Sequence, residues 1–587
     1  MRQTLLHRHS FLALSAMLAA SYGWSSTAAV AQSSNGATQA MQSKLGNYLA
    51  GRIARGQNNT RDAARFYGNA LKRAPGSPAI IERAFMMKAS EGQFEDATEL
   101  AKSLITRKPT HRLARLWLGT AAFIEKDYKR ADRHFRASAS GPIAELTATL
   151  ARGWTSYAAG NGRKALRALS SQNQAEWAQF YSAYHRALVA DLVGARKTSA
   201  KSFRAVVQKD LRAPRTAIAF ARSLAKAGDR DGALAVMRRY VARSGGVGHP
   251  ASNEIIKLLE SNAPVDRLIS SPRDGLAEVF YGLGEALATE GGGTPLGMVY
   301  LQLALSLQPE FPFALASLAN VYETVRDFER ANETYSRIPD GTPFQGPIEI
   351  RKALNLNSLE QVEKARKLLV AKIKREPQNL EAIEALANML RSRKRYEEAI
   401  VYYSKAIDLV GKPTSRDWTY WYARGTCYER TKQWPKAEAD LLKAKGLKPN
   451  QPLILNYLGY SWVDQNQRLD EGLDLIKSAV KLKPDDGYIV DSLGWAYYRL
   501  GDISKAVKHL ERAVELKPED PILNDHLGDA LWRAGRHREA RYQWELALWF
   551  KPEPEEIIKI RGKLSRGLPG KAFVRKTDTK TGVSPVR

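Results

Sequence analysis

One spacing recurs through the last third of the chain and constrains its fold more than any other feature. Four rows of small or cyclic residues advance along the sequence in steps of 34, with one step of 35 in each row that crosses the loop before Gly472. A fixed period of this length indicates a stack of short structural units instead of one globular core. The rows are Gly425, Gly459, Gly494 and Gly528; Ala437, Gly472, Ala506 and Ala540; Ala444, Ala479, Ala513 and Ala547; and Pro449, Pro484, Pro518 and Pro552.

In the best-preserved unit, apolar residues follow the helical period twice, and a glycine-aspartate pair separates the two runs. Residues three or four apart share one face of a helix, and proline ends a helix. Each unit is therefore predicted to be an antiparallel helix pair, which must stack on neighbours to bury its apolar face. The first run holds Val490, Leu493, Gly494 and Tyr497, the second holds Ala506, Leu510, Ala513 and Pro518, and the separating pair is Gly501-Asp502.

This unit resembles the tetratricopeptide repeat (TPR) at every consensus position except the first, where Val490 replaces tryptophan. The resemblance implies an all-α fold, a right-handed superhelical solenoid of TPR helix pairs held together by contacts between neighbouring repeats. It also implies a surface for binding, because proteins of this family usually contact their ligands through first helices that line a concave face.

The same frame runs backward through most of the chain in two arrays, and a glycine-rich segment from Ser244 to Pro250 interrupts it. In the N-terminal array, Ala63, Ala97 and Ala131 again lie 34 residues apart. The predicted divisions are a signal peptide (1–31), an N-terminal linker (32–43), a basic N-terminal array (44–243), a phase break or hinge (244–273), a C-terminal array (274–553), a capping helix (554–566) and a disordered basic tail (567–587).

The first 31 residues have the three parts of a secretory signal. A basic start is followed by the apolar run Phe11–Ala20 and a small-residue end, which predicts cleavage after Ala31. An uncleaved membrane anchor and a first amphipathic helix are the alternatives, but the run is shorter than the roughly 20 residues that a membrane span needs. No cysteine stands at the cleavage point for lipid attachment. We therefore expect a periplasmic protein whose mature chain has no transmembrane segment.

The chain has a formal net charge of +29, and the excess is concentrated in the N-terminal array. Residues 33–260 hold 38 Lys and Arg against 17 Asp and Glu, whereas residues 261–587 hold 50 against 44. A basic solenoid can bind nucleic acid, an acidic protein or an anionic envelope component, or its charge can serve solubility alone. Because the signal predicts export, we do not expect nucleic acid as the partner.

The resemblance places candidate ligand contacts on first helices at both ends of the molecule. Aromatic rings and polar groups at helical spacing favour a peptide groove, and the alternative is that some of these rings pack between repeats. The Lys and Asn clamp of one TPR subclass is not matched, because Asn388 follows Glu384 instead of a basic residue. The candidates are Tyr48, Arg52 and Arg55 at one end, and Tyr460, Asp491, Trp495, Tyr498, Asp525, Asp529 and Trp532 at the other.

The sequence contains no motif for catalysis or for a cofactor. There is no P-loop, no His-Glu-x-x-His, no Cys-x-x-Cys and no Gly-x-Ser-x-Gly. Cys427, the only cysteine, follows Gly425 at a place where a small buried residue is expected. Asp525 and Asp529 offer too few oxygen ligands for a metal, and we interpret them as a solvated acidic patch. We expect no enzyme activity, no cofactor and no metal.

The arrangement resembles large envelope TPR proteins of Gram-negative bacteria, some of which dock a carboxyl-terminal processing protease or cell-wall enzymes. This resemblance implies a non-catalytic periplasmic scaffold or adaptor that binds one or more envelope proteins and brings such an enzyme to its substrates. The alternative is that the basic N-terminal array binds an anionic envelope polymer or a lipid headgroup. Binding of that kind weakens steeply with salt, whereas a groove lined by aromatic rings keeps its ligand.

Overall fold

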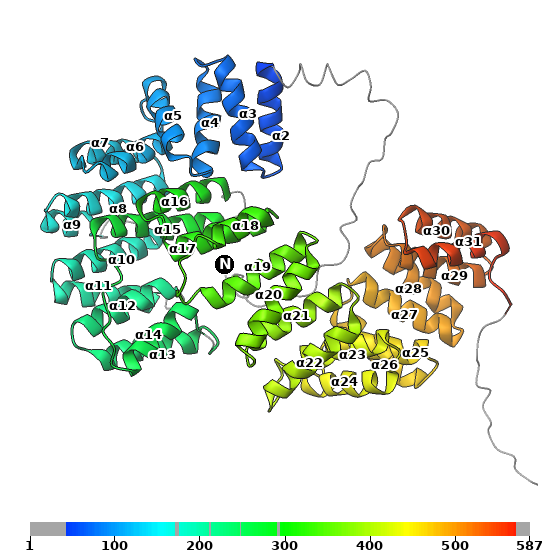
Figure 1. The fold of residues 1–587 in the computed structure, drawn as a ribbon. Coiled ribbons are helices and arrows are strands. Elements are labelled where there is room, and N and C mark those ends of the chain that lie inside the picture. The colour runs from blue at the N-terminus through cyan, green and yellow to red at the C-terminus, as the bar shows by residue number, and fades with distance from the viewer. Residues whose placement is uncertain (1–42, 171–174, 210–212, 247, 290–293, 571–587) are drawn as a thin grey trace, which may run out of the picture. The chain divides into compact units, whose positions relative to one another are not determined.

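The computed structural model describes residues 43–170, 175–209, 213–246, 248–289 and 294–570. These ranges contain thirty α-helices, α2 to α31, and no strand, so the predicted all-α fold is confirmed. Most helices follow one another as antiparallel pairs (Figure 1). The chain divides into two compact units, residues 1–368 and 369–587, which we call unit 1 and unit 2.

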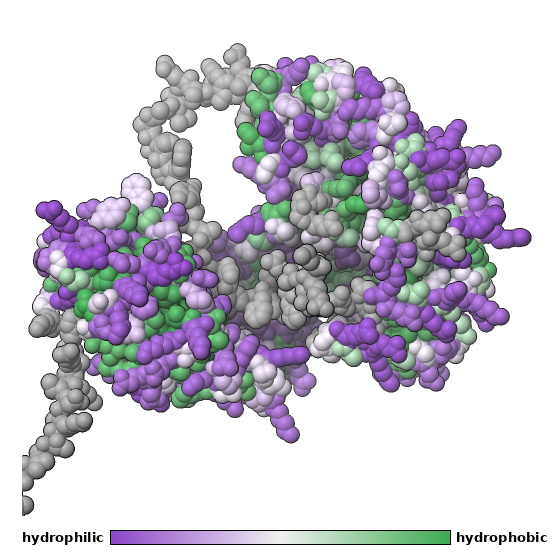
Figure 2. Space-filling model, turned by 180° about the vertical axis from the view of Figure 1, so that it is seen from behind, coloured by the Kyte–Doolittle hydropathy of each residue, from purple (hydrophilic) through white to green (hydrophobic). Residues whose placement is uncertain are grey.

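Unit 1 is a stack of helix pairs with one unpaired helix, α14. Its outer surface in Figure 2 is mostly hydrophilic, in agreement with the excess of basic residues in this part of the chain. The helices are α2 (Lys44–Gly56), α3 (Thr60–Arg73), α4 (Pro78–Ser90), α5 (Phe94–Arg107), α6 (Arg112–Ile124), α7 (Tyr128–Ser138), α8 (Pro142–Ala158), α9 (Gly162–Ala168), α10 (Glu176–Leu192), α11 (Arg196–Lys209), α12 (Pro214–Lys226), α13 (Arg230–Arg243), α14 (Pro250–Glu260), α15 (Pro272–Thr289), α16 (Thr294–Leu307), α17 (Pro312–Thr324), α18 (Phe328–Tyr335) and α19 (Gln345–Ser358).

Unit 2 continues the same pattern with five helix pairs and a final helix. The division between the units falls within α20 (Val362–Arg375). The remaining helices are α21 (Leu380–Ser392), α22 (Tyr396–Val410), α23 (Trp418–Arg430), α24 (Trp434–Leu447), α25 (Pro452–Asp464), α26 (Leu469–Leu482), α27 (Gly487–Leu500), α28 (Ile503–Leu516), α29 (Pro521–Arg533), α30 (His537–Trp549) and α31 (Pro554–Arg566).

The turn inside a pair is set by two adjacent residues. Gly501 has a φ of 83°, which ends α27, and the Asp502 side chain accepts a hydrogen bond from the amide of Lys505, which caps α28. The predicted break is therefore confirmed, although Asn, Lys or Arg often stands in the left-handed position instead of Gly. The same arrangement occurs at Asn58-Asn59, Lys126-Asp127, Gly160-Asn161, Gly228-Asp229 and Arg326-Asp327.

The row of glycines on the first helices allows the two helices of a pair to cross closely. A Cβ placed on Gly494 would lie 2.6 Å from Cγ of Leu510, and one on Gly459 would lie 2.6 Å from the carbonyl oxygen of Gly472. Separations this short are not tolerated by real side chains. The 34-residue spacing of small residues thus records the crossing point of each pair.

The expected phase break at 244–273 is packed into the core of unit 1, and the chain divides elsewhere, within α20. Helix α14 forms in this segment and is capped by His249, whose Nδ1 accepts from the amide of Ala251 at 3.1 Å. Ile255, Val265 and Ile269 are buried in the same cluster as the helices on both sides. The segment lost the repeat pattern but kept apolar residues, and these hold it in place.

Helix α31 occupies the segment predicted to form a capping helix. Ile560 on its inner face is 1% exposed and lies in one cluster with Trp544 and Ala547 of α30. The predicted signal peptide, linker residues 32–42 and tail residues 571–587 lie outside the described residues. Of the helices in the described ranges, none is long and apolar enough to cross a membrane.

Candidate protein-binding surfaces

The first-helix face of the N-terminal pairs is covered by helices from later in the same chain. Helix α15 packs on α8, and α16 packs on α4 and α6 (Figure 1). Trp154 of α8 is fully buried, and a Cβ on Gly275 of α15 would lie 2.3 Å from its ring. The hydroxyls of Thr147 and Tyr300 hydrogen-bond at 3.0 Å between α8 and α16. Unit 1 therefore fills much of its own inner face.

A buried ion pair joins this inner segment to the first pairs of unit 1. Arg330 of α18 donates from Nη1 to both oxygens of Glu91, at 2.7 and 2.9 Å, and to the Thr60 hydroxyl at 3.2 Å. The side chains of Arg330 and Glu91 are only 4% and 8% exposed. Burial lowers the pKa of Arg330, but the carboxylates outweigh it and raise the pKa overall, so the guanidinium stays charged.

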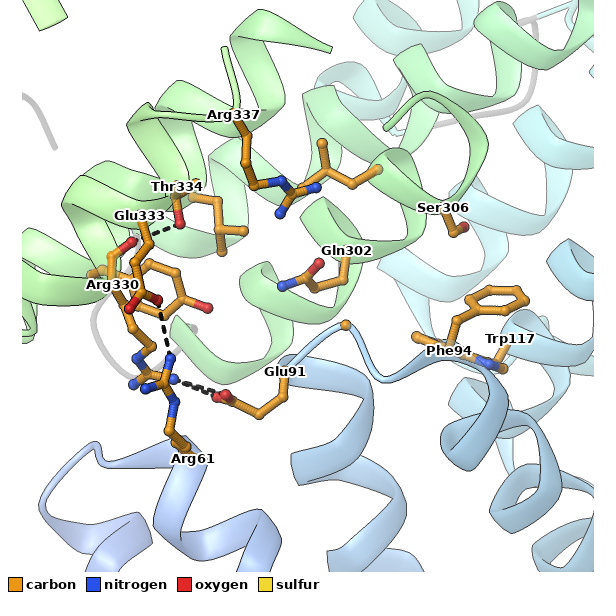
Figure 3. A pocket seen from close by; sticks show the side chains of 14 residues that line it. Arg61, Glu91, Phe94, Trp117, Gln302, Ser306, Arg330, Glu333, Thr334 and Arg337 are labelled. Carbon is orange, nitrogen blue, oxygen red and sulfur yellow. Dashed lines mark hydrogen bonds and ion pairs between the residues drawn. The ribbon is translucent and has the colours of Figure 1, made fainter. Parts of the chain in front are cut away.

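A cavity of about 280 Å³ lies beside this pair (Figure 3). Arg61 on one wall pairs with Glu333 at 3.2 Å, and Nη2 of Arg330 has no hydrogen-bond partner among the described residues. Arg337 and Gln302 point toward the same space in Figure 3. Arg61 and Arg330 face carboxylates, whereas Arg337 donates to the carbonyl oxygen of Pro309 at 3.5 Å. We assign the cavity no ligand.

A second buried network holds α10, α12 and α15 together. Tyr184 donates to Oε1 of Glu278 at 2.8 Å, and Nε of Arg215 donates to the same oxygen at 3.1 Å. The Arg215 guanidinium also lies 4.6 Å from the ring centre of Phe313. Burial and the Glu278 carboxylate raise the pKa of Tyr184 well above its ordinary value, so its hydroxyl keeps the proton that it donates. The network fixes α15 where it covers the inner face.

The predicted N-terminal contact residues behave differently from one another. Tyr48 is half-buried, meets Tyr67 edge to face at 5.8 Å and lies under the guanidinium of Arg83 at 5.4 Å. It therefore packs within the first pairs. Arg52 and Arg55 are exposed on α2. Their predicted role in binding stays a prediction.

In unit 2 the first helices are linked mainly to one another, and one exposed ion pair at 3.2 Å joins Lys394, which follows α21, to Glu553, which precedes α31. The principal helix contacts join elements one or two apart in sequence. On each first helix a carboxylate accepts from, or pairs with, a polar group one repeat further on, and we call this series the carboxylate ladder. It comprises Glu384 with Tyr420, Glu429 with Tyr457, Asp464 with Arg499, Asp491 with His526, and Asp525 and Asp529 with Lys563.

Three rings stack beside the middle of the ladder. The Trp495 ring lies 4.8 Å from that of Tyr498 and 4.1 Å from that of His526, at interplanar angles of 16° and 20°. Trp495 is half-buried, and its indole Nε1 is a buried donor without an acceptor among the described residues. The exposed part of the ring is the kind of surface that a bound peptide uses.

His526 is held by Asp491, which the sequence had placed on the binding face. The Nδ1 atom of His526 lies 3.0 and 3.1 Å from the two oxygens of Asp491. Burial lowers the pKa of the imidazole, but the charge of Asp491 and the hydrogen bond outweigh it, so the pKa is raised above its ordinary value. The pair thus links α27 to α29 most strongly when His526 is protonated.

The interpretation of Asp525 and Asp529 as a solvated acidic patch was wrong. They are 8% and 6% exposed, and both accept from Nζ of Lys563 on α31, at distances from 2.8 to 2.9 Å. Asp529 also accepts from the indole of Trp544 at 3.0 Å. Burial of a charge is costly unless a counter-charge accompanies it, and the capping helix supplies that charge.

Tyr460 and Trp532 lie at the edges of packed clusters. Tyr460 is half-buried beside Val463 and Leu493, and burial with nearby carboxylates raises the pKa of its hydroxyl. Trp532 lies 4.3 Å from His537 and 5.4 Å from Trp544, centre to centre. Trp495, Tyr498 and Trp532 lie in or against one cluster at this end of unit 2, with Asp491 linked to it through His526 and Asp529 through Trp544. Their role in binding a ligand stays a prediction.

Sequence reasoning missed His526 and Lys563, and one signal could have found them. Lys563 follows Asp529 by 34 residues, and His526 follows Asp491 by 35. An acid and a base one repeat apart fall on neighbouring first helices.

The described residues contain no group of three or more side chains that could hold a metal ion. Cys427 is fully buried in α23, and burial raises the pKa of its thiol to about 12. A thiol with so high a pKa is not a nucleophile at neutral pH. Cys427 packs as a small apolar residue, as predicted.

Comparison with known proteins agrees with this geometry. A tetratricopeptide repeat family model matches residues 88–142, 351–412 and 492–549. These matches cover α5 to α7, the pairs from α19 to α22, and the pairs α27–α28 and α29–α30. The chain therefore carries tetratricopeptide repeats and folds as an all-α TPR solenoid. Repeats of this kind make protein-binding scaffolds.

Two relatives illustrate the extent of the similarity. The chain is 28% identical to the TPR repeat-containing protein PA4667 of Pseudomonas aeruginosa over 204 residues, which cover 33% of this chain and 32% of that protein. It is 31% identical to human tetratricopeptide repeat protein 13 over 142 residues, 24% of this chain and 16% of that one. The matched segments thus span a third or less of these relatives. The crystal structure of yeast Tom70 aligns with 89% of this chain and 95% of its own at 13% identity and a TM-score of 0.35.

Proposed function

We propose that the protein is a non-catalytic periplasmic scaffold that binds envelope proteins on the first-helix face of unit 2. One observation carries the proposal: the inner face of unit 1 is covered by α15 and α16, whereas among the described residues the principal contacts of the first helices of unit 2 are with elements one or two apart in sequence. Two half-buried rings, Tyr460 and Trp495, and an indole donor without an acceptor among the described residues lie on that face.

The ladder indicates what kind of partner this face would accept. Glu384 and Glu429 accept from neutral tyrosine hydroxyls, and Asp525 and Asp529 share one lysine. The ladder therefore keeps an excess of negative charge, which opposes a polyanion. Binding free energy would come mainly from the rings, which contribute contact area at low entropic cost. A segment of a folded protein fits this description better than a polyanion does.

The location and the partners follow from the sequence. The signal-like first 31 residues support export to the periplasm. A scaffold there would bring one envelope protein to another, and a processing protease or a cell-wall enzyme with its substrate is the pairing that we propose. The excess basic charge of residues 33–260 supports a second candidate, the binding of an anionic envelope polymer or lipid headgroup by unit 1.

Affinity capture from an envelope extract tests the proposal. The chain is used as bait at low and at high salt, beside Trp495→Ala, with Trp549→Ala as the matched control because Trp549 is 77% exposed on a second helix. We expect a protein that the parent and the control retain at high salt and that Trp495→Ala loses. Retention only at low salt and indifferent to Trp495 would favour the anionic ligand, and no retained protein under any condition would overturn the scaffold.

A further inference from the structure

The terminal helix α2 presents an apolar stripe on its outer side. Leu45, Leu49 and Ile53 are 65%, 45% and 62% exposed, and they follow one another at intervals of one helical turn. The buried residues of the helix, Asn47 and Ala54 among them, face α3 on the opposite side. Figure 2 shows the hydrophobic strip at the edge of unit 1 where α2 lies.

The equivalent positions in later repeats show what kind of element packs against such a stripe. Leu49 and Ile53 precede Arg83 and Met87 by 34 residues, and the next two repeats place Trp117 with Ala121 and Ala151 with Thr155 at the same positions. In those later first helices the second helix of the preceding pair packs alongside, and all of these residues except Arg83 are 7% exposed or less. In α2 the positions stand open. The stripe is therefore the place where a helix packs.

Once the predicted signal peptide is removed, the residues left before α2 are poorly suited to supply that helix. Residues 32–42 read Gln-Ser-Ser-Asn-Gly-Ala-Thr-Gln-Ala-Met-Gln, with no Leu, Ile, Val or aromatic residue to meet the stripe. A second copy of the chain is also poorly suited. Helix α2 carries Lys44, Arg52 and Arg55 and no acidic residue, so two copies would bring like charges together.

We propose that the α2 stripe docks an amphipathic helix of another protein, with aliphatic residues on one face and acidic residues at its margins. The helix would extend the solenoid by one element, with its acids placed against Arg52 and Arg55. This inference rests on the proposed scaffold function and adds a second docking place, on unit 1.

Site-specific photo-crosslinking tests the inference. A benzoylphenylalanine at position 49 of the full chain is irradiated in an envelope extract, with the same group at position 442 as control, because Leu442 is a 40% exposed helix residue in unit 2. The expected product from position 49 maps to an acid-rich amphipathic helix of another protein. The doubly substituted chain Leu49→Glu/Ile53→Glu should lose that partner at least about tenfold, a change of roughly 1.4 kcal/mol, whereas Leu442→Glu should keep it.

Other products would overturn the inference. Crosslinks to residues 1–42, to a second copy, to lipid, or no product above the level at position 442 each exclude a docked partner helix. The proposed function is judged separately, because the high-salt capture that depends on Trp495 does not require α2. If that capture succeeds and the crosslink fails, only the docking place on α2 is lost.

Discussion

Trp154 in unit 1 and Trp495 in unit 2 occupy the same repeat position, directly after a glycine of the crossing row. Trp154 is fully buried, touches the backbone of α15 and donates to Nδ1 of His185 at 3.0 Å. Trp495 is half-buried, stacks on two neighbouring rings and has no acceptor for its indole among the described residues. The same sequence position is thus fully buried in one unit and half-buried in the other.

This difference shows that the repeat sequence determines the structure of each helix pair. It does not determine which other part of the chain, if any, packs on the first-helix face. In unit 1 a later stretch of the same chain covers that face and is held by buried polar networks. In unit 2 the face is held by the carboxylate ladder between successive repeats, which stabilises the stack without covering it. Contacts of the first kind are long-range, and contacts of the second kind are between nearest neighbours.

Among the substitutions that we predict, loss of the buried Arg330–Glu91 ion pair in unit 1 should lower the stability most. Arg330→Met leaves Glu91 buried without a counter-charge, which costs about 4 kcal/mol. We expect the free energy of opening of α16 to α18, measured by native-state hydrogen exchange, to fall by that amount while unit 2 is unchanged.

The matched control is Arg61→Met, which removes an arginine from a pair whose side chains are 60% and 64% exposed. Its effect should stay below about 1 kcal/mol. The double variant Arg330→Met/Glu91→Gln should recover part of the loss, because no lone charge remains. An equal loss in the free energy of opening from Arg330→Met and Arg61→Met would contradict the conclusion that a buried ion pair holds α16 to α18 against the first pairs.

Removal of the Lys563 ammonium group should cause the second largest loss of stability. The loss should be confined to the C-terminal end of unit 2. Lys563→Met leaves Asp525 and Asp529 without their shared partner, at a cost of about 3 kcal/mol. Hydrogen exchange should speed up in α29 to α31, with no change in unit 1. Asp525→Asn/Asp529→Asn in the same chain should restore protection, and a failure to do so would argue against a charge effect.

A side chain at the crossing point should have an intermediate effect. Gly459→Ala places a Cβ 2.6 Å from the carbonyl oxygen of Gly472. The two helices must separate, which costs about 2 kcal/mol. The loss should be confined to α25, α26 and their neighbours. Gly446→Ala is the control, since a Cβ there meets nothing within 4 Å.

The Asp491–His526 pair is the rung of the carboxylate ladder that joins α27 to α29. Its removal should cause the smallest loss of stability, and this loss should depend on pH. The pKa of His526 is raised in the folded chain, so the rung stabilises unit 2 fully below the ordinary histidine pKa, and this contribution is lost as pH rises through the raised value. Asp491→Asn should therefore destabilise unit 2 more at about pH 5.5 than at about pH 9. Thermal melts at both pH values measure this, and a larger loss at the higher pH would contradict the sign.

Local structure was predictable from sequence because its causes are local. The 34-residue rows located the crossing glycines, Gly501-Asp502 located a turn, and Ile560 marked the inner face of the final helix. Helix pairs of this kind are set by residues within one period. The predicted phase break or hinge at 244–273 stays a prediction, and in the structure its apolar residues are buried in the core of unit 1.

The surfaces were less predictable because their causes are distant in the chain. Arg330 meets Glu91 across 239 residues and Thr147 meets Tyr300 across 153, and no periodic pattern connects such pairs. Sequence placed Asp525 and Asp529 on the right helix but in solvent, since Lys563 belongs to a helix outside the repeat. The aromatic positions near Trp495 were found, but their stacking on His526 was not.

Hydroxyl-radical footprinting of the full chain, read by mass spectrometry, tests the central claim most directly, because both tryptophans are reported in one sample without any substitution. The account predicts that Trp495 is oxidised at least about tenfold faster than Trp154, and that a retained protein partner protects Trp495 and leaves Trp154 unchanged. Equal oxidation of the two rings, or protection of Trp154 alone by the partner, would contradict it.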